Sequence, residues 1–174
     1  DILHKSDAGG VKLNLVGEAP LRDAFQAIHS NAQAYDPNAQ IEGVLVTPMA
    51  EKGVEVIIGM LRDPIFGPVL MFGLGGIFVE VLEDVAFRSL PLTLHDAQSM
   101  VDQLKAQKVL AGVRGAAGVD KQALVSLLMQ VSQLVEAYPE ISELDLNPVI
   151  AYPKGHSAAN YAIVDARIIV ERQS

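Results

Sequence analysis

The 174-residue chain is long enough for one domain with a real hydrophobic core or for two small lobes, and half of its residues are apolar. Its formal net charge of -8 argues against binding to nucleic acid or to an anionic membrane, because both need basic surfaces. The chain has no cysteine, which excludes disulfides, zinc–thiolate sites and thiol nucleophiles and fits a cytoplasmic location.

Neither a signal peptide nor a membrane span is predicted. The first ten residues lack a basic start and an apolar stretch. The longest apolar run, residues 68–82, is interrupted by three glycines and a glutamate. The chain also starts abruptly, without Met, so we expect it to be a fragment of a longer protein.

The opening segment "DILHKSDAGG" places a His, a Lys and two Asp ahead of a glycine pair. One interpretation is a turn at the end of a strand. The other is a loop that handles phosphate, since the imidazole of His4 can attack phosphorus and Lys5 can stabilise the developing charge. The residues of this segment alone leave both interpretations open.

The next elements are predicted from hydrophobic periodicity. Alternating apolar and polar residues predict a half-buried strand over 11–16, and Leu21, Phe25 and Ile28 define the apolar side of a helix over 21–35. The β-branched run over 41–49 predicts a further strand.

Hairpins are predicted in the middle of the chain. Glu51–Gly53 has the composition of a turn at the start of residues 50–61, which joins residues 41–49 to a strand in the rest of that segment. Residues 63–82 predict one or two more strands, with turns at Asp63–Pro64 and Gly67–Pro68.

The second half of the chain predicts two helices and two strands. The first helix covers residues 90–112 and stops at Gly112, and the second is capped by Asp120 after a glycine-rich loop. The core-facing stripe of the second helix is Leu124, Leu127, Leu128, Val131, Leu134 and Val135. Strands follow over 141–152 and 160–171, joined by a turn at 153–155.

This order of elements predicts a single α+β domain over residues 1–174, with a largely antiparallel sheet packed by helices.

The three histidines outside the opening segment are expected to have structural or surface positions without a functional role. We expect His29 at the surface or as a cap, His95 as a cap near a helix start, and His156 in a solvated turn.

Polar residues in the last two strands form a candidate metal site. Glu143, Asp145 and Asn147 point to one face of their strand, and Asp165 lies within an apolar strand where it needs a partner. If the strands pair in register, Asn147 and Asp165 become neighbours. Carboxylate and amide oxygens with open positions suit Mg²⁺, whereas the alternative is a hydrogen-bonded pair that closes the hairpin.

Glycines and arginines provide candidate anion contacts. Gly73, Gly75 and Gly76 let backbone amides approach an anion, or they mark a bulge in a strand. Arg88 and Arg114 lie in or near glycine-flanked loops and can clamp phosphate, or they are ordinary surface residues.

Taken together, these segments resemble a known family. "HKSDAGGVKLNL", "GVLVTPM", "RDPIFGPVLMFGLGGIFVEVLEDVAFR", "LAGVRG" and "ELDLNPVIA…AIVDARI" occur in this order. They resemble the ATP-grasp domain of NDP-forming acyl-CoA synthetases, the ADP-forming acetyl-CoA synthetase family related to the β subunit of succinyl-CoA synthetase. The resemblance covers nearly the whole chain.

The resemblance implies a reaction in three stages. An acyl-CoA and phosphate give an acyl phosphate and CoA at a separate CoA-binding domain or subunit, a histidine of that domain takes the phosphoryl group, and the ATP-grasp domain passes it to ADP. It implies ATP or ADP and Mg²⁺ as cofactors. It also implies His4 as a second phosphorylated histidine that carries the group between the two distant sites, with Lys5 and the amides of Gly9 and Gly10 stabilising it. It leaves oligomerisation open.

The resemblance also implies the site residues. Asn147 and Asp165 match the Mg²⁺ ligands, with Asp145 close by. The residues implied to line the nucleotide phosphates are Gly73, Gly75, Gly76 and Glu80. Backbone groups from Val46 to Met49 would read the base, although Thr47 stands where relatives carry Gln or Glu. Glu55 is a ribose or phosphate neighbour.

An ATP-grasp fold also needs an N-terminal lobe over the nucleotide, and this chain starts after the strand that precedes the HKSD motif in the family. We therefore expect the fragment to be inactive alone. The alternative function is a regulatory module, because the same domain occurs fused to lysine acetyltransferases and could there sense a ligand without catalysis.

Overall fold

The computed structural model describes residues 2, 5–76, 83–112, 115, 117–156 and 159–171. The chain divides into two compact units, Asp1–Met49 and Ala50–Ser174. Their union in a single domain over residues 1–174 stays a prediction.

The first unit contains one helix, α1 (Glu18–Tyr35). Glu18 and Arg22 form an ion pair one turn apart, at 2.7 Å, and the amide of Asp36 closes the last turn on the carbonyl of Ala32. The predicted helix is therefore confirmed and begins three residues earlier than expected. His29 lies within it, half-buried, with its ring 4.7 Å from that of Phe25.

Two strands predicted in this unit are wrong. Residues 11–16 are irregular, with Asn14 at a φ of 57° and the side chain of Val16 85% exposed. Residues 41–49 belong to no strand either, and Leu45 is 87% exposed. A strand is stabilised by pairing with a neighbouring strand. The described residues of this unit contain no strand with which either segment could pair.

The hairpin predicted at Glu51–Gly53 is also wrong. Gly53 instead comes so close to a later strand that an added Cβ would lie 2.5 Å from the carbonyl oxygen of Ala151. Glycine is needed here for the approach of two backbones, not for a turn.

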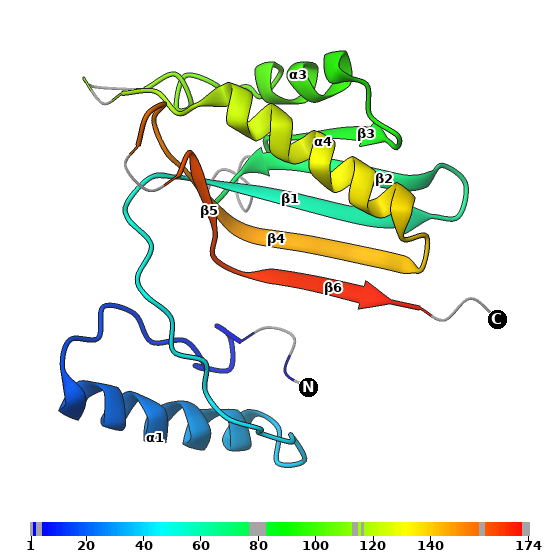
Figure 1. The fold of residues 1–174 in the computed structure, drawn as a ribbon. Helices are drawn as coiled ribbons and strands as arrows, with labels where there is room; N and C mark the ends of the chain where they lie inside the picture. Colours follow the sequence, from blue (N-terminus) through cyan, green and yellow to red (C-terminus); the bar gives the residue numbers. More distant parts are fainter. Residues whose placement is uncertain are drawn as a thin grey trace. The chain divides into compact units, whose positions relative to one another are not determined.

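The second unit holds an antiparallel sheet (Figure 1). Its strands are β1 (Val54–Asp63), β2 (Gly67–Leu74), β3 (Val85–Ser89), β4 (Ile141–Ala151), β5 (Tyr161–Ile163) and β6 (Ala166–Val170). The order is β3-β2-β1-β4-β5, and β6 also pairs with β4. The turn between β1 and β2 falls at residues 64–66, next to the predicted Asp63–Pro64. The predicted α+β class is confirmed.

Helix α3 (Leu94–Asp102) is shorter than the predicted 90–112. Its cap is a reciprocal pair of Thr93 and Asp96, whereas His95 is exposed and is not the cap. The helix ends early because the buried carboxylate of Asp84 accepts the amides of Lys105 and Ala106, each at 2.8 Å. Those amides are thereby turned away from a continuing helix.

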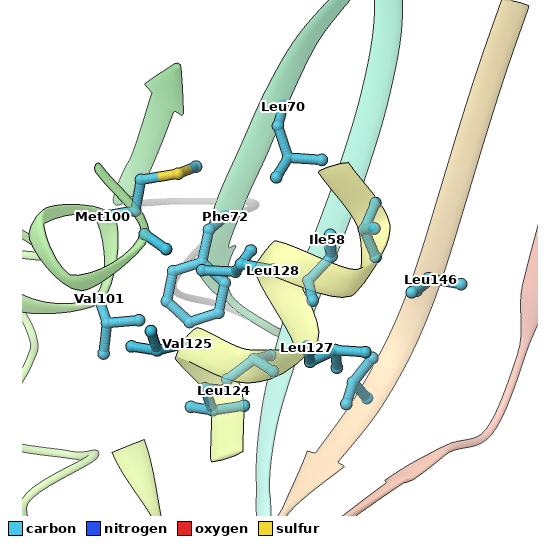
Figure 2. Packing of buried hydrophobic residues seen from close by; sticks show 14 of the residues in the cluster. Ile58, Leu70, Phe72, Met100, Val101, Leu124, Val125, Leu127, Leu128 and Leu146 are labelled. Atoms are coloured by element: carbon cyan, nitrogen blue, oxygen red, sulfur yellow. The ribbon is translucent and has the colours of Figure 1, made fainter. Parts of the chain in front are cut away.

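Helix α4 (Lys121–Ala137) begins as predicted, with Asp120 accepting the amides of Gln122 and Ala123. Its stripe belongs to the core as predicted, buried at every position except Leu134, which is partly buried. Figure 2 shows Leu128 of α4 and Met100 of α3 around Phe72 of β2. The core thus lies between the sheet and these two helices.

Helices α3 and α4 lie on the same face of the sheet (Figure 1). Val56, Ile58 and Met60 of β1 point to this helix-covered face. Alternate residues point to the opposite face, which we call the distal face. On β1 the distal residues are Glu55, Ile57, Gly59 and Leu61. No helix among the described residues is long and apolar enough to cross a membrane.

Candidate functional site on the distal face of the sheet

Asn147 and Asp165 lie directly opposite each other. β4 pairs Val149 with Ile163 and Leu146 with Ala166, and the same register continued between these pairs joins Asn147 to Asp165. The amide of Asn147 donates to the carbonyl of Asp165 at 3.1 Å. Directly opposite residues of an antiparallel pair share a face, with Cα atoms about 4.5–5.5 Å apart. The predicted neighbourhood of the two residues is therefore confirmed.

A bulge sets the direction of Asn147. On β1 the register shifts between Val56 and Ile58, so that one residue, Ile57, faces two residues of β4, Asn147 and Pro148. Leu146 and Val149 both point into the helix-covered core on either side of this bulge. The bulge leaves Asn147 exposed, next to Leu146 but on the distal face.

Charged residues continue the row along β4 and β6. Glu143 and Asp145 precede Asn147 on the distal face, and Arg167 lies opposite Asp145. Nη2 of Arg167 donates to Oε1 of Glu143 diagonally across the two strands. Sequence reasoning did not single out Arg167. Its spacing of two from Asp165 was the signal that could have found it.

Glu55 and the glycine turn form a second group on the distal face. The amide of Gly75 donates to the carbonyl of Glu55 at 2.8 Å, and an added Cβ on Gly75 would lie 2.9 Å from Cβ of Glu55. Gly76 has a φ of 60°, and an added Cβ there would lie 3.9 Å from the Glu55 carboxylate. Gly73 pairs with Ile57 on the same face. Three predicted glycines and Glu55 are thus brought together.

Two buried isoleucines lie between the polar groups. Ile57, one of the distal residues of β1, is 5% exposed, and Ile150, which pairs with Glu55, is 8% exposed. Neither belongs to the hydrophobic cluster under α3 and α4. The distal face therefore combines apolar area with carboxylate, amide and glycine groups, the usual composition of a small-molecule site.

Arg88 is not part of this group. It pairs with Leu70 on the helix-covered face, and its guanidinium donates to Ser99 of α3 at 2.8 Å and to the side chain of Gln103 at 2.7 Å. These bonds give Arg88 a role in anchoring α3, which differs from the predicted phosphate clamp.

The remaining described candidates belong to the first unit. Lys5 is exposed in a turn in which the amide of Gly10 donates to the carbonyl of Lys5 at 2.8 Å and that of Gly9 to Ser6 at 3.0 Å. Both amides predicted to hold a phosphoryl group are therefore used inside the turn itself. Val46 and Met49 are exposed in an extended segment. His4, Glu80 and Arg114 lie outside the described residues.

His156 corrects another expectation. It was expected to be solvated, yet its side chain is only 18% exposed and its ring stacks on Tyr152 with centroids 4.3 Å apart. Its Nε2 lies 3.0 Å from the Glu51 carboxylate, and the Tyr152 hydroxyl donates to the carbonyl of Glu51. This cluster fixes the segment that enters β1.

The donor set at Asn147 and Asp165 fits Mg²⁺ bound together with phosphate. Within the described residues, no group of three or more His, Cys, Asp or Glu side chains could hold a metal ion unaided. Mg²⁺ in phosphate-binding sites is commonly held by one or two carboxylates, with water and substrate phosphates filling its other positions. One carboxylate opposite one amide, on an exposed face, meets that requirement.

Known proteins share this fold and sequence. The ATP-grasp domain family matches residues 1–170. The β subunit of acetate–CoA ligase [ADP-forming] II from Pyrococcus furiosus is 50% identical over 171 residues, which span 98% of this chain and 71% of the relative.

Solved structures of related enzymes share the same fold. The dinucleotide forming acetyl-coenzyme A synthetase 1 of Ca. Korarchaeum cryptofilum, in complex with coenzyme A and Ca-AMPCP, is 51% identical with a TM-score of 0.89 over 98% of this chain and 72% of that one. A second structure of that enzyme, with coenzyme A and Mg-AMPPCP and its phosphohistidine segment pointing towards the nucleotide binding site, is 47% identical with a TM-score of 0.79 over 98% of this chain and 72% of that one. With the match along 1–170 and the shared fold, the chain belongs to the ATP-grasp family, as the ATP-grasp region of an ADP-forming acyl-CoA synthetase of the acetyl-CoA synthetase β-subunit type.

Proposed function

We propose that the distal face binds the phosphates of a magnesium nucleotide and that this region transfers a phosphoryl group between the nucleotide and a phosphohistidine. The observation that carries the proposal is the pair of Asn147 and Asp165, which the β4 register places directly opposite each other. The nucleotide- and Mg²⁺-containing structures of the relatives support the same ligand class.

Asn147 and Asp165 would hold the ion through the amide and carboxylate oxygens. When bound, Mg²⁺ supplies neutralisation of the charge that develops on the phosphate oxygens. Glu55 and the turn at Gly75–Gly76 lie on the same face, where glycine backbone lets a phosphate chain approach closely. Glu55 is assigned to the ribose or to a phosphate-bound water, since a carboxylate repels a bare phosphate oxygen.

His4 is the proposed carrier of the phosphoryl group, by its place in the HKSD segment. In the direction of ATP synthesis the N–P bond to the imidazole breaks while a P–O bond forms to the terminal oxygen of ADP. Lys5 stabilises the charge of the transferred group. The other partner is a CoA-binding domain or subunit, where a first histidine would take the group from an acyl phosphate and pass it to His4.

The central test is Asp165→Asn in the complete enzyme. We expect Mg-ADP affinity to fall at least ten-fold in titration calorimetry, because the substitution removes the only carboxylate of the proposed ligand pair. Glu136→Gln, which removes the same charge from the exposed side of α4, is the matched control and should leave the affinity unchanged. An Asp165→Asn protein that melts normally and binds Mg-ADP like wild type would contradict the proposal.

Phosphohistidine labelling tests the transfer itself. Incubation of the complete enzyme with Mg²⁺ and γ-labelled ATP should label wild type on histidine and leave His4→Ala without label on any histidine, because the label would have to pass through His4 first. A regulatory module that only senses a ligand would bind nucleotide without becoming labelled. The same measurement therefore separates the catalytic proposal from the regulatory alternative.

A further inference from the structure

The row of charges next to Asn147 and Asp165 contains one cation. On the distal face, β4 presents Glu143 and Asp145 ahead of Asn147, while the opposing segment presents Asp165 and then Arg167. Three carboxylates and one guanidinium thus lie within three successive cross-strand pairs of the distal face. The guanidinium is the only cationic side chain that this ladder presents on the distal face within the described residues of β4, β5 and β6.

The position of Arg167 is fixed by its contacts. It lies opposite Asp145 and reaches diagonally to the carboxylate of Glu143, and both side chains of this ion pair are 32% exposed. Diagonal neighbours across antiparallel strands are within reach of a long side chain such as arginine. A half-buried, planar guanidinium in this place holds its acceptor in a defined direction better than a mobile surface cation would.

Without the positive charge of Arg167, the site would be expected to bind a divalent metal ion more tightly. Asp145 lies two residues from Asn147 on the same face, so without Arg167 its carboxylate could join that of Asp165 around a divalent cation. A site with more carboxylates binds the ion without help from a phosphate. Among the described residues, no three acidic, cysteine or histidine side chains are grouped so that they could hold a metal.

We propose that Arg167 is a positioning residue that makes divalent-cation binding at Asn147 and Asp165 conditional on nucleotide phosphate. By engaging Glu143 and facing Asp145, the guanidinium keeps these carboxylates from the ion, which must then complete its coordination with phosphate oxygens. This inference rests on the proposed function, since it concerns the same metal site.

Mn²⁺ binding without nucleotide tests the proposal in the complete enzyme. Electron paramagnetic resonance measures the free ion directly. R167Q is expected to bind Mn²⁺ at least five-fold more tightly than wild type in the absence of nucleotide, and R167K, which keeps the positive charge, should restore weak binding. Adding D145N to R167Q should return the affinity towards wild type, because it removes the recruited carboxylate.

Two results would overturn the proposal. One is a folded R167Q protein with the Mn²⁺ affinity of wild type, and the other is R167Q binding that D145N does not reverse. If R167Q does not fold, the double variant E143Q/R167Q restores the formal charge of the row and carries the same expectation and the same overturning result.

The controls separate this inference from the proposed function. Unchanged Mg-ADP affinity in Asp165→Asn would contradict the proposed metal site itself, and with it the role of Arg167. Weakened Mg-ADP affinity in Asp165→Asn together with unchanged Mn²⁺ binding in R167Q would contradict only the proposed role of Arg167 and would leave the metal site supported. Thermal melting of each variant checks folding, and a purely structural role of Arg167 would shift the melting temperature without tightening Mn²⁺ binding.

Discussion

The two faces of the sheet are built by the same strands and differ in what those strands present. On β1, Val56 and Ile58 enter the helix-covered core, whereas Glu55 and Ile57 point to the distal face. On β4, Leu144 and Leu146 alternate with Asp145 in the same way. One face stabilises the unit, and the other carries every described residue of the second unit that the proposed function uses.

The bulge opposite Ile57 shows how both requirements are met. Strict alternation along β4 would turn Val149 away from the core once Leu146 points into it. The extra residue at Asn147–Pro148 restores the alternation, so apolar residues on both sides stay in the core. The bulge thus places the proposed ligand Asn147 on the distal face without interrupting the packing of the core on either side.

The largest expected effect comes from the helix-covered face. Phe72 is fully buried among Met100 and Leu128 (Figure 2), so Phe72→Ala should cost about 3–5 kcal/mol of unfolding free energy. Phe87 on the adjacent strand pairs with Met71 on the distal face and is 54% exposed, and Phe87→Ala should cost about 1 kcal/mol or less. Urea unfolding of both variants measures the difference between the faces, and equal losses would contradict it.

A smaller effect is expected on the distal face. In Gly75→Ala the new Cβ would lie 2.9 Å from Cβ of Glu55, which forces the β2 end or Glu55 to shift at a cost of about 1–3 kcal/mol. Because the shift occurs in the proposed site, Mg-ADP affinity should also fall. Gly43→Ala is the control, since an added Cβ there meets nothing within 4 Å. A Gly75→Ala protein with wild-type stability and affinity would show that this close approach is not needed.

The elements that could be predicted from sequence are of two kinds. Some are stabilised by residues close in the chain, and others have a hydrophobic periodicity that identifies them without knowledge of distant partners. Asp120 caps α4 through amides two and three residues away, and the stripe from Leu124 to Val135 needs only helical periodicity. The pairing of Asn147 with Asp165 was also predictable, because a single hairpin register determines it.

The errors arose where the deciding partner is distant. Residues 41–49 have strand composition, but a strand needs a neighbour that composition does not reveal. The early end of α3 depends on Asp84, which precedes Lys105 by 21 residues, and the role of Gly53 depends on Ala151. Arg88 likewise could be assigned to α3 only once Gln103 was placed beside it.

The smallest expected effect concerns two surface carboxylates that hold the ends of elements on this sheet. Thr93, through its hydroxyl and its amide, donates to Asp96 and lowers the pKa of that carboxyl below 3.8. The amides of Phe66 and Ile65 lower the pKa of Asp63 in the same way. Both residues are partly exposed and lie at the surface, where solvent screens the charge, so each contribution is small.

The sign of the pH dependence follows from the direction of these shifts. A carboxyl whose pKa is lower in the folded than in the unfolded state contributes stability above the unfolded value of 3.8, and the contribution disappears as pH falls through the folded value. The melting temperature of Asp96→Asn should therefore lie slightly below that of wild type from about pH 7 to pH 5, and the gap should close below about pH 4. Asp96 anchors the start of α3 on the helix-covered face, so Mg-ADP affinity should stay unchanged across the variant. A gap that widens on acidification would contradict the lowered pKa of Asp96. A loss of nucleotide affinity would mean that the cap of α3 and the distal face are coupled.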